Sequence, residues 1–428
     1  MTSFMLTAMV ALFALSVPIA IAVAAASIGS IVLFERIPLI VVAQKMMTSI
    51  DSFPLMAVPF FILAGHLMEA GGISRRLVEF AKAIIGGVQG GLACSCVLTC
   101  MIFAAVSGSS VATTFAIGAI IIPAMIEHRY PREFAAALQA TSAELGVIIP
   151  PSIPMILYGV SAEVSIGEMF VAGIGPGLLI GAVLTVFVYA TCKLNGWGRD
   201  DAADRMSFVK ATERAALALL MPVIVLGGIY RGVFTPTEAS VVAVFYAAIV
   251  GMAVYRTISP TDLVPILKKS VISSAMIMFI IAAAGLFSFL ITRAGVPATV
   301  GAWIAETIGS KWAFLLAVNA FLFLVGMFIE TSAAIIVLAP ILVPVAKQFG
   351  VDPVHFGLIV VVNLALGMIT PPFGVNLFAA CQVANISLER IVPRLVPFVL
   401  TVLACLMVIT YVPQVSLFFR DLLYAAGP

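Results

Sequence analysis

Apolar residues dominate long stretches of the chain, and charged residues gather in the short segments between them. A helix of about 20 apolar residues crosses the hydrocarbon core of a bilayer. On this basis we expect membrane-spanning helices at 4–33, 52–68, 134–160, 168–192, 214–231, 237–255, 270–290, 356–384 and 395–419. We expect the first run, 4–33, to cross once, with a bend at Pro18 and two crossings as the alternative, and the segment 69–90 to be a loop. The pattern predicts an all-α polytopic membrane protein.

Between Ile37 and Asp51 the pattern changes to that of a short amphipathic segment. Val41 and Val42 are apolar, whereas Lys45 is charged. A helix with this pattern can lie flat at the membrane interface. We expect it to brace the spans on either side.

Two further apolar segments, 91–126 and 311–346, carry polar residues near their centres, at 107–110 and 330–332. A bend at 107–110 leaves about 16 residues on each side, roughly 24 Å of helix, which is short for a hydrocarbon core of about 30 Å. We therefore favour two re-entrant helical hairpins that enter the membrane and return to the same side. Two short full spans remain the alternative for each segment.

A second pattern, L-G-x-I-x-P-P, occurs at 145–151 and again at 366–372. Proline interrupts a helix because it lacks an N–H donor and clashes with the preceding turn. The pattern therefore predicts two discontinuous helices, at 134–160 and 356–384. The offset is 371 − 150 = 221 for the prolines of the breaks, and 344 − 123 = 221 for those of the hairpins.

The constant offset predicts two repeats, 1–192 and 237–428, joined by a loop and a span at 193–236. The basic residues indicate how the repeats are oriented. If each hairpin returns to its own side, one face carries Arg75, Arg76, Lys82, Arg129, Arg132, Lys193, Arg199, Arg205, Lys210, Arg214, Arg256, Lys268, Lys269, Arg390 and Arg394. The other face carries Arg36, Lys45, Arg231, Arg293, Lys311, Lys347 and Arg420.

The more basic face is expected to be cytoplasmic, so the two hairpins enter from opposite sides of the membrane. The two repeats then have inverted topology. Inverted repeats that each contain a broken helix are typical of secondary transporters, which bind their solute and ions near the middle of the bilayer.

The composition excludes several other functions. The chain is 63% hydrophobic and 10% charged, with a formal net charge of only +2, so nucleic-acid binding is not indicated. Neither a Ser-His-Asp arrangement nor a Gly-rich phosphate-binding motif is present, so the sequence does not predict an enzyme or an ATPase. Cys94, Cys96 and Cys100 lie in an apolar run without a neighbouring His or carboxylate, and we interpret them as small packing residues.

A helix broken at membrane depth leaves backbone oxygens free, and such oxygens can bind Na⁺. At the first hairpin and break we expect one Na⁺ site, formed by Ser107, Ser109, Gly146, Ile149 and Pro151. At the second we expect another, formed by Phe328, Glu330, Thr331, Gly367, Thr370 and Pro372. The alternative is that these small residues only allow helices to pack closely.

Polar side chains beside the breaks could bind a solute, and the helix N-termini created there favour an anion. The candidates are Ser110, Ser152, Tyr158, Glu330, Asn363 and Asn376. Glu330 is expected to bind an ion or the solute, because a carboxylate within the membrane is costly. Glu144 could bind a cation, accept a proton, or accept a hydrogen bond from a freed backbone N–H.

The turn at 107–110 and the two proline-pair breaks resemble those of the large, DctM-like membrane subunit of tripartite ATP-independent periplasmic (TRAP) transporters. The resemblance covers nearly the whole chain. It implies an elevator-type transporter that couples Na⁺ to the import of an organic acid, such as a C4-dicarboxylate, sialic acid or a similar carboxylate, across a bacterial inner membrane. It also implies two partners, a small four-helix membrane subunit and a periplasmic substrate-binding protein.

The family's two Na⁺ sites would lie at the hairpin tips and breaks named above. Glu330 and Thr331 stand where the first hairpin has Ser109 and Ser110, so the two sites need not bind alike. Two other functions remain in view. One is a stand-alone carboxylate or ion permease of the elevator class, and the other is a membrane-embedded enzyme, which the duplication of the polar groups disfavours.

Overall fold

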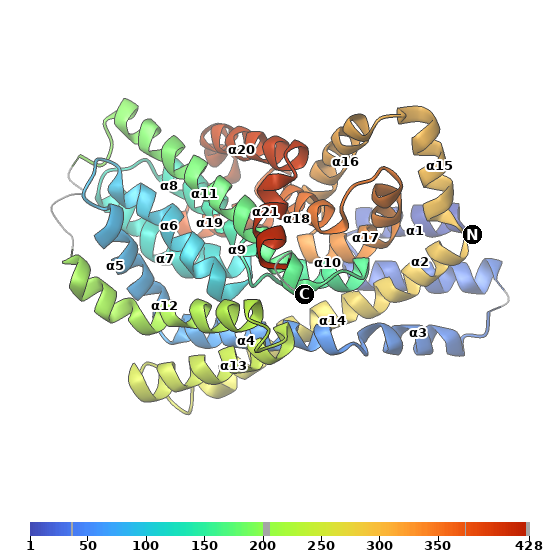
Figure 1. The fold of residues 1–428 in the computed structure, drawn as a ribbon, viewed down its shortest axis with the longest axis horizontal. Helices are drawn as coiled ribbons and strands as arrows, with labels where there is room; N and C mark the ends of the chain where they lie inside the picture. The colour runs from blue at the N-terminus through green and yellow to red at the C-terminus, as the bar shows by residue number, and fades with distance from the viewer. Residues whose placement is uncertain (36, 200–205, 373, 425–428) are drawn as a thin grey trace.

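The computed structural model describes residues 1–35, 37–199, 206–372 and 374–424, and the regular elements within these ranges are helices (Figure 1). Eight of these helices are long and apolar enough to cross a membrane, or ten spans result if each bent pair counts as one. The chain is therefore an all-α, multi-pass membrane protein, as the sequence predicts. Arg36 and Arg205, counted above among the basic loop residues, lie outside the described residues.

The first half of the chain holds eleven α-helices and one short 3-10 helix, η1 (Phe53–Met56). In order, the α-helices are α1 (Thr2–Ala14), α2 (Ile19–Phe34), α3 (Ile40–Ile50), α4 (Ala57–Ala70), α5 (Ile73–Ile85), α6 (Gly91–Ser107), α7 (Ser110–Glu127), α8 (Arg132–Ala143), α9 (Leu145–Ile148), α10 (Ile153–Ala162) and α11 (Ile166–Asn195). Helix α12 (Phe208–Tyr230) then leads into the second half.

The second half begins with α13 (Pro236–Ile249), which ends in a turn of π-helix, η3 (Val250–Val254). The remaining helices are α14 (Leu263–Arg293), α15 (Val296–Ile308), α16 (Lys311–Gly326), α17 (Thr331–Gln348), α18 (Pro353–Met368), α19 (Val375–Ala384), α20 (Leu388–Tyr411) and α21 (Gln414–Tyr424). Helix α7 maps onto α17 at both ends, since 331 − 110 = 221 and 348 − 127 = 221.

One difference between the halves concerns α14, the longest helix of the second half. Shifted back by 221 positions, α14 covers 42–72, a stretch that the first half divides among α3, η1 and α4. Helices α3 and α4 lie nearly end to end and both pack along α14 (Figure 1). The contact is antiparallel, because Lys269, near the start of α14, pairs with Glu69, at the end of α4, at 3.2 Å.

The run 4–33, expected to be one span, is not one continuous helix. The run forms two helices, α1 and α2, which pack against each other. Ser16 has a positive φ of 61°, and Pro18 directly precedes α2, so the backbone turns between them. The physical reason is that a proline after a left-handed residue cannot continue the preceding helix.

The segment 69–90 is not a loop either, because it contains α5. This helix buries Leu77, Val78 and Ala81 on one side, and Arg75 faces Glu79 at 3.4 Å on the other. The charged residues lower the mean hydropathy of the segment although its apolar residues keep helical spacing. A criterion based on long apolar runs therefore missed it, and α15 likewise lay outside the expected spans.

Both proline pairs interrupt a helix where the sequence predicts it. Helices α9 and α10 are separated by 149–152, and the chain bends there by 42°. Helices α18 and α19 are separated by a gap that contains the second pair. After each break the chain packs against the hairpin of the other half: α10 packs on α17, and α19 packs on α7. The two halves are thus interlocked around the two breaks.

Candidate functional site

The turn of the first hairpin is built from three small residues. Helix α6 ends at Ser107, Gly108 adopts a left-handed conformation with φ of 61°, and Ser109 begins α7 by accepting a hydrogen bond from the Ala112 N–H at 3.4 Å. Two features disfavour a side chain at Gly108. One is its positive φ, and the other is the Pro151 carbonyl oxygen, which would lie 2.8 Å from an added Cβ. The turn therefore lies directly against the first proline pair.

Several oxygen atoms gather inside this turn. The Thr113 hydroxyl donates to the Ser109 carbonyl at 2.8 Å, and the hydroxyls of Ser107 and Thr113 are 3.1 Å apart. The Ser107 hydroxyl also lies 3.4 Å from the Ser109 carbonyl. Ser107 and Thr113 are buried. The group presents hard oxygen ligands with little access to water.

The backbone of the broken helix closes the other side of this oxygen group. A Cβ added to Gly146 would lie 2.8 Å from both the Ser109 carbonyl oxygen and the Thr113 hydroxyl oxygen. The structure thus brings together four of the five residues expected at the first Na⁺ site. Ile149 begins the break, and its side chain lies against Gly177 of α11, so only its backbone could contribute.

The turn of the second hairpin is capped by a carboxylate. One Glu330 oxygen accepts hydrogen bonds from the backbone N–H groups of Ser332 and Ala333 at 2.9 and 3.1 Å, and the other accepts from the Ser332 hydroxyl at 2.9 Å. A negative charge at the N-terminus of α17 is favourable for the helix dipole. Glu330 therefore acts as a helix cap here, in the position that Ser109 holds in the first hairpin.

The other residues expected at the second site are less enclosed. Phe328 is 55% exposed and Pro372 is also exposed. The Thr331 hydroxyl points at the Met368 sulfur, 2.9 Å away, and the Thr370 hydroxyl donates to the Leu366 carbonyl at 2.8 Å. These contacts connect the turn to the end of α18, but they form no oxygen group like that of the first turn.

Gly367 brings α18 into backbone contact with α16. A Cβ added to Gly326 of α16 would lie 3.1 Å from the Gly367 Cα and 3.0 Å from the Leu364 carbonyl oxygen. The role seen for Gly367 is close helix packing, the alternative left open above for the small residues of the sites.

Among the solute candidates, Ser110 and Ser152 are buried beside the first break. The Ser152 hydroxyl donates to the Val147 carbonyl at 2.6 Å and accepts from the Met155 N–H at 3.4 Å, so it caps α10. Asn376 donates to one oxygen of the buried Glu144 carboxylate. The second Glu144 oxygen and the Asn376 amide oxygen have no partner among the described residues.

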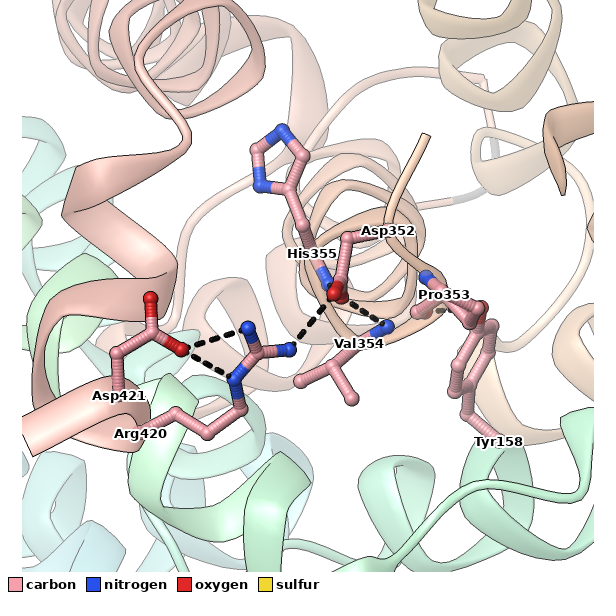
Figure 2. A network of polar contacts seen from close by, with 7 residues as sticks. All are labelled: Tyr158, Asp352, Pro353, Val354, His355, Arg420 and Asp421. Carbon is pink, nitrogen blue, oxygen red and sulfur yellow. Dashed lines mark hydrogen bonds and ion pairs between the residues drawn. The ribbon is translucent and has the colours of Figure 1, made fainter. Parts of the chain in front are cut away.

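Two candidates lie elsewhere. The Tyr158 hydroxyl donates to the Pro353 carbonyl at 2.7 Å, at the start of α18 (Figure 2). The second break lies at the other end of α18. That helix has 16 residues, so the break is about 24 Å from Pro353. Asn363 donates to the backbone and side-chain oxygens of Asn319 at 3.0 and 2.7 Å. Neither side chain is brought together with the hairpin turns.

Near Tyr158, Asp352 caps α18 and pairs with the last helix (Figure 2). It accepts from the N–H groups of Val354 and His355 at 2.8 and 3.0 Å, and Arg420 of α21 donates to it at 2.8 Å. Burial alone would raise the pKa of Asp352, but the hydrogen bonds and the charge of Arg420 outweigh burial and hold the pKa below its usual value of 3.8. This ion pair ties α21 to α18.

Sequence reasoning missed Thr113, Asn319 and the pairing of Glu144 with Asn376. Thr113 follows Ser109 by four residues, and residues spaced i, i+4 share one helix face. That spacing could have identified it. The Glu144–Asn376 pair joins residues 232 positions apart, and no local signal marks such a contact.

The structure contains two discontinuous helices, and each packs against a helical hairpin. This arrangement is typical of a helical membrane transporter. Residues 6–415 match the profile of the family described as tripartite ATP-independent periplasmic transporter, DctM component. The chain belongs to this family, so the resemblance noted in the sequence is confirmed. It is a subunit of a transporter and not an enzyme.

Two named relatives cover most of the chain. It is 46% identical to the isethionate TRAP transporter permease protein DctMQ of Oleidesulfovibrio alaskensis, over 94% of this chain and 64% of that protein. It is 41% identical to the C4-dicarboxylate TRAP transporter large permease protein DctM of Pseudomonas aeruginosa, over 91% of each chain. The chain thus spans less than two thirds of the first relative.

The fold also matches a solved transporter of different sequence. The YdaH transporter of Alcanivorax borkumensis superposes with a TM-score of 0.65 over 92% of this chain and 91% of that chain. The two sequences are only 14% identical, so this similarity concerns the fold alone.

Proposed function

We propose that this chain is the permease subunit of a Na⁺-coupled importer of an organic acid, located in a bacterial inner membrane. Its two named relatives carry isethionate and C4-dicarboxylate in their names, and both are small organic anions. A sulfonate or carboxylate of similar size is therefore the expected solute. We expect a small four-helix membrane subunit and a periplasmic substrate-binding protein to complete the transporter.

The observation that carries Na⁺ coupling is the oxygen group at the first hairpin. Two hydroxyls and the Ser109 carbonyl lie within 3.4 Å of one another and against the backbone of Gly146 and Pro151. Backbone and hydroxyl oxygens are ligands that a hard monovalent cation accepts. The first Na⁺ ion would be held by Ser107, Ser109, Gly146, Ile149 and Pro151, with Thr113 added.

A second Na⁺ ion would be bound near Glu330, Thr331, Thr370 and the carbonyls of the second break. The carboxylate of Glu330 would distinguish this second site from the first, which has hydroxyl and backbone oxygens. The solute would bind between the two hairpins, with Ser110, Ser152 and Asn376 nearest to the breaks.

The packing of α10 on α17 and of α19 on α7 supports an elevator motion. Because the helix after each break is packed against the opposite hairpin, the hairpins and broken helices would move as one unit. The remaining long helices, with α14 beside α3 and α4, would form the fixed part. The units 1–192 and 237–428 would then be inverted repeats, each contributing one hairpin and one broken helix.

The experiment is uptake of radiolabelled organic acid into proteoliposomes that contain the permease, its small subunit and loaded binding protein. We expect uptake only with an inward Na⁺ gradient. Thr113→Val should raise the Na⁺ concentration needed for half-maximal uptake by about tenfold, because it removes one oxygen of the group. Thr114→Val is the matched control, since the Thr114 hydroxyl is equally buried and, among the described residues, bonds only to the Ser110 carbonyl of its own helix.

Uptake that is indifferent to the Na⁺ gradient would contradict the coupling. Uptake that persists without the binding protein would instead identify a stand-alone permease of the elevator class. If Thr113→Val and Thr114→Val need the same Na⁺ concentration for half-maximal uptake, the oxygen group at the first hairpin does not bind the ion.

A further inference from the structure

A polar cavity of about 550 Å³ lies between α3 and the end of α14, away from both hairpin turns. Its floor is the contact between Gly285 and Ser49. A side chain at Gly285 would collide with the Ser49 hydroxyl, so the glycine allows α3 to lie directly on α14. The cavity is open toward the outside of the molecule. Its polar lining includes Lys45, Thr48, Ser49, Ser288, Thr292 and Arg293.

Two basic side chains face this cavity from different helices. The Lys45 ammonium lies 4.7 Å from the centre of the Phe289 ring and has no carboxylate partner in the part of the chain that the structure describes. Arg293 faces Glu35 at 3.8 Å, too far for a hydrogen bond, and its side chain is 56% exposed. Glu35 offsets part of this charge, so the cavity keeps a net positive character.

Hydroxyl donors stand between the two charges. Ser49 and Thr48 donate to carbonyls of their own helix, at 2.6 and 2.9 Å. Ser288 and Thr292, one turn apart on α14, make no hydrogen bond from their side chains within the described ranges. Two free hydroxyls beside two cations are a suitable arrangement for the oxygens of a phosphate.

The cavity lies where the apolar part of α14 ends, because Arg293 is the last residue of that helix. On the face of α3 opposite Lys45, Ile40 and Met47 are 62% and 64% exposed. Helix α3 has no buried residue, as expected of a helix at the membrane interface. A ligand there would meet cations and hydroxyls, with the ring of Phe289 beside them.

We propose that this cavity binds the phosphate headgroup of an anionic phospholipid. Lys45 and Arg293 neutralise the phosphate, Ser288 and Thr292 donate hydrogen bonds to it, and the acyl chains extend past Phe289 into the hydrocarbon region. The bound lipid fastens α3 to α14 and so stabilises the fixed part of the transporter.

The experiment counts bound lipids by native mass spectrometry of the full chain in detergent, with phosphatidylglycerol or phosphatidylcholine of identical acyl chains added. We expect tighter binding of phosphatidylglycerol, and a loss of about 25-fold in its affinity in Lys45→Gln/Arg293→Gln, about fivefold for each basic residue. Ser288→Ala is a second variant with unchanged charge, expected to weaken binding by a few fold. Lys268→Gln, exposed at the other end of α14, is the matched control and should bind like the wild type.

Three results would overturn the proposal. One is equal affinity for the two lipids. Another is unchanged phosphatidylglycerol binding in the folded double variant, with Ser288→Ala also unchanged. The third is binding of glycerol phosphate or inorganic phosphate as tight as that of the lipid, which would mark a site for soluble anions.

Discussion

The side-chain amide of Asn376, in α19, donates a hydrogen bond to the carboxylate of Glu144, at the start of α9. Both side chains are buried, with exposed fractions of 0% and 3%. The contact connects the first broken helix to the second across 232 positions of sequence. It is therefore a polar connection between the two halves at the centre of the candidate site.

Replacing Asn376 by Leu should lower the stability of the folded protein by about 1–3 kcal/mol, because the buried Glu144 oxygen loses the one donor it has among the described residues. The measurement is thermal unfolding of the detergent-solubilised protein, followed by tryptophan fluorescence. Combining Asn376→Leu with Glu144→Leu should restore part of the loss, since the unpaired buried carboxylate is removed as well. A double variant less stable than the sum of the two single changes would contradict this account.

Gly367→Ala should destabilise the protein by about 1–3 kcal/mol, because the added methyl group would enter the backbone of Gly326 on α16. The change should also reduce uptake, since α18 would be displaced next to its break. Gly227→Ala in α12 is the control, because nothing lies within 4 Å of its added Cβ. In a helix interior this control should be neutral or slightly stabilising. Equal loss in both variants would show that the close α16–α18 contact is not the cause.

Glu330→Gln should raise the Na⁺ concentration needed for half-maximal uptake by about tenfold or more, if the carboxylate binds the second ion. The amide oxygen of Gln can still accept from the N–H groups at the start of α17, so the thermal midpoint should change little. Ser332→Ala removes the hydroxyl that bonds to Glu330 and leaves the charge in place. A Glu330→Gln variant with wild-type Na⁺ dependence would limit Glu330 to its capping role.

The Asp352–Arg420 pair should make stability depend on pH. Because the pKa of Asp352 is lower in the folded protein than its usual 3.8, this contribution is present above about pH 4 and is lost as the pH falls through the folded-state pKa. Asp352→Asn keeps the helix cap but removes the charge, and should cost at most about 1 kcal/mol at neutral pH. The difference from wild type should shrink on acidification. Arg420→Gln should behave in the same way, and a difference that grows toward low pH would have the wrong sign.

The interruptions of the helices could be predicted from the sequence because their causes are local. Each break carries two adjacent prolines, whereas the single prolines Pro123 and Pro344 lie inside α7 and α17. Gly108 permits the tight turn of the first hairpin. The length of an apolar run is a weaker signal. It merged α1 with α2, where Pro18 had already marked the division.

The partners of buried polar side chains could not be predicted in the same way. Tyr158 and Asn363 were chosen as solute ligands because they follow or precede a break in the sequence. The structure instead pairs them with Pro353 and Asn319, which lie on other segments. Which face of a helix meets which neighbour depends on tertiary packing, and one sequence gives no direct measure of it.

The uninterrupted helix α14 beside the divided line of α3, η1 and α4 gives the two halves different mechanical properties. A continuous helix resists bending along its whole length, whereas a line of separate helices bends most easily at its joint, here at 51–56. Backbone amides at 51–56 should accordingly exchange with deuterium faster than those 221 positions later, at 272–277, within α14. In the proposed elevator motion, a displacement of the hairpins and broken helices would therefore bend the line of α3 and α4 more than it bends α14.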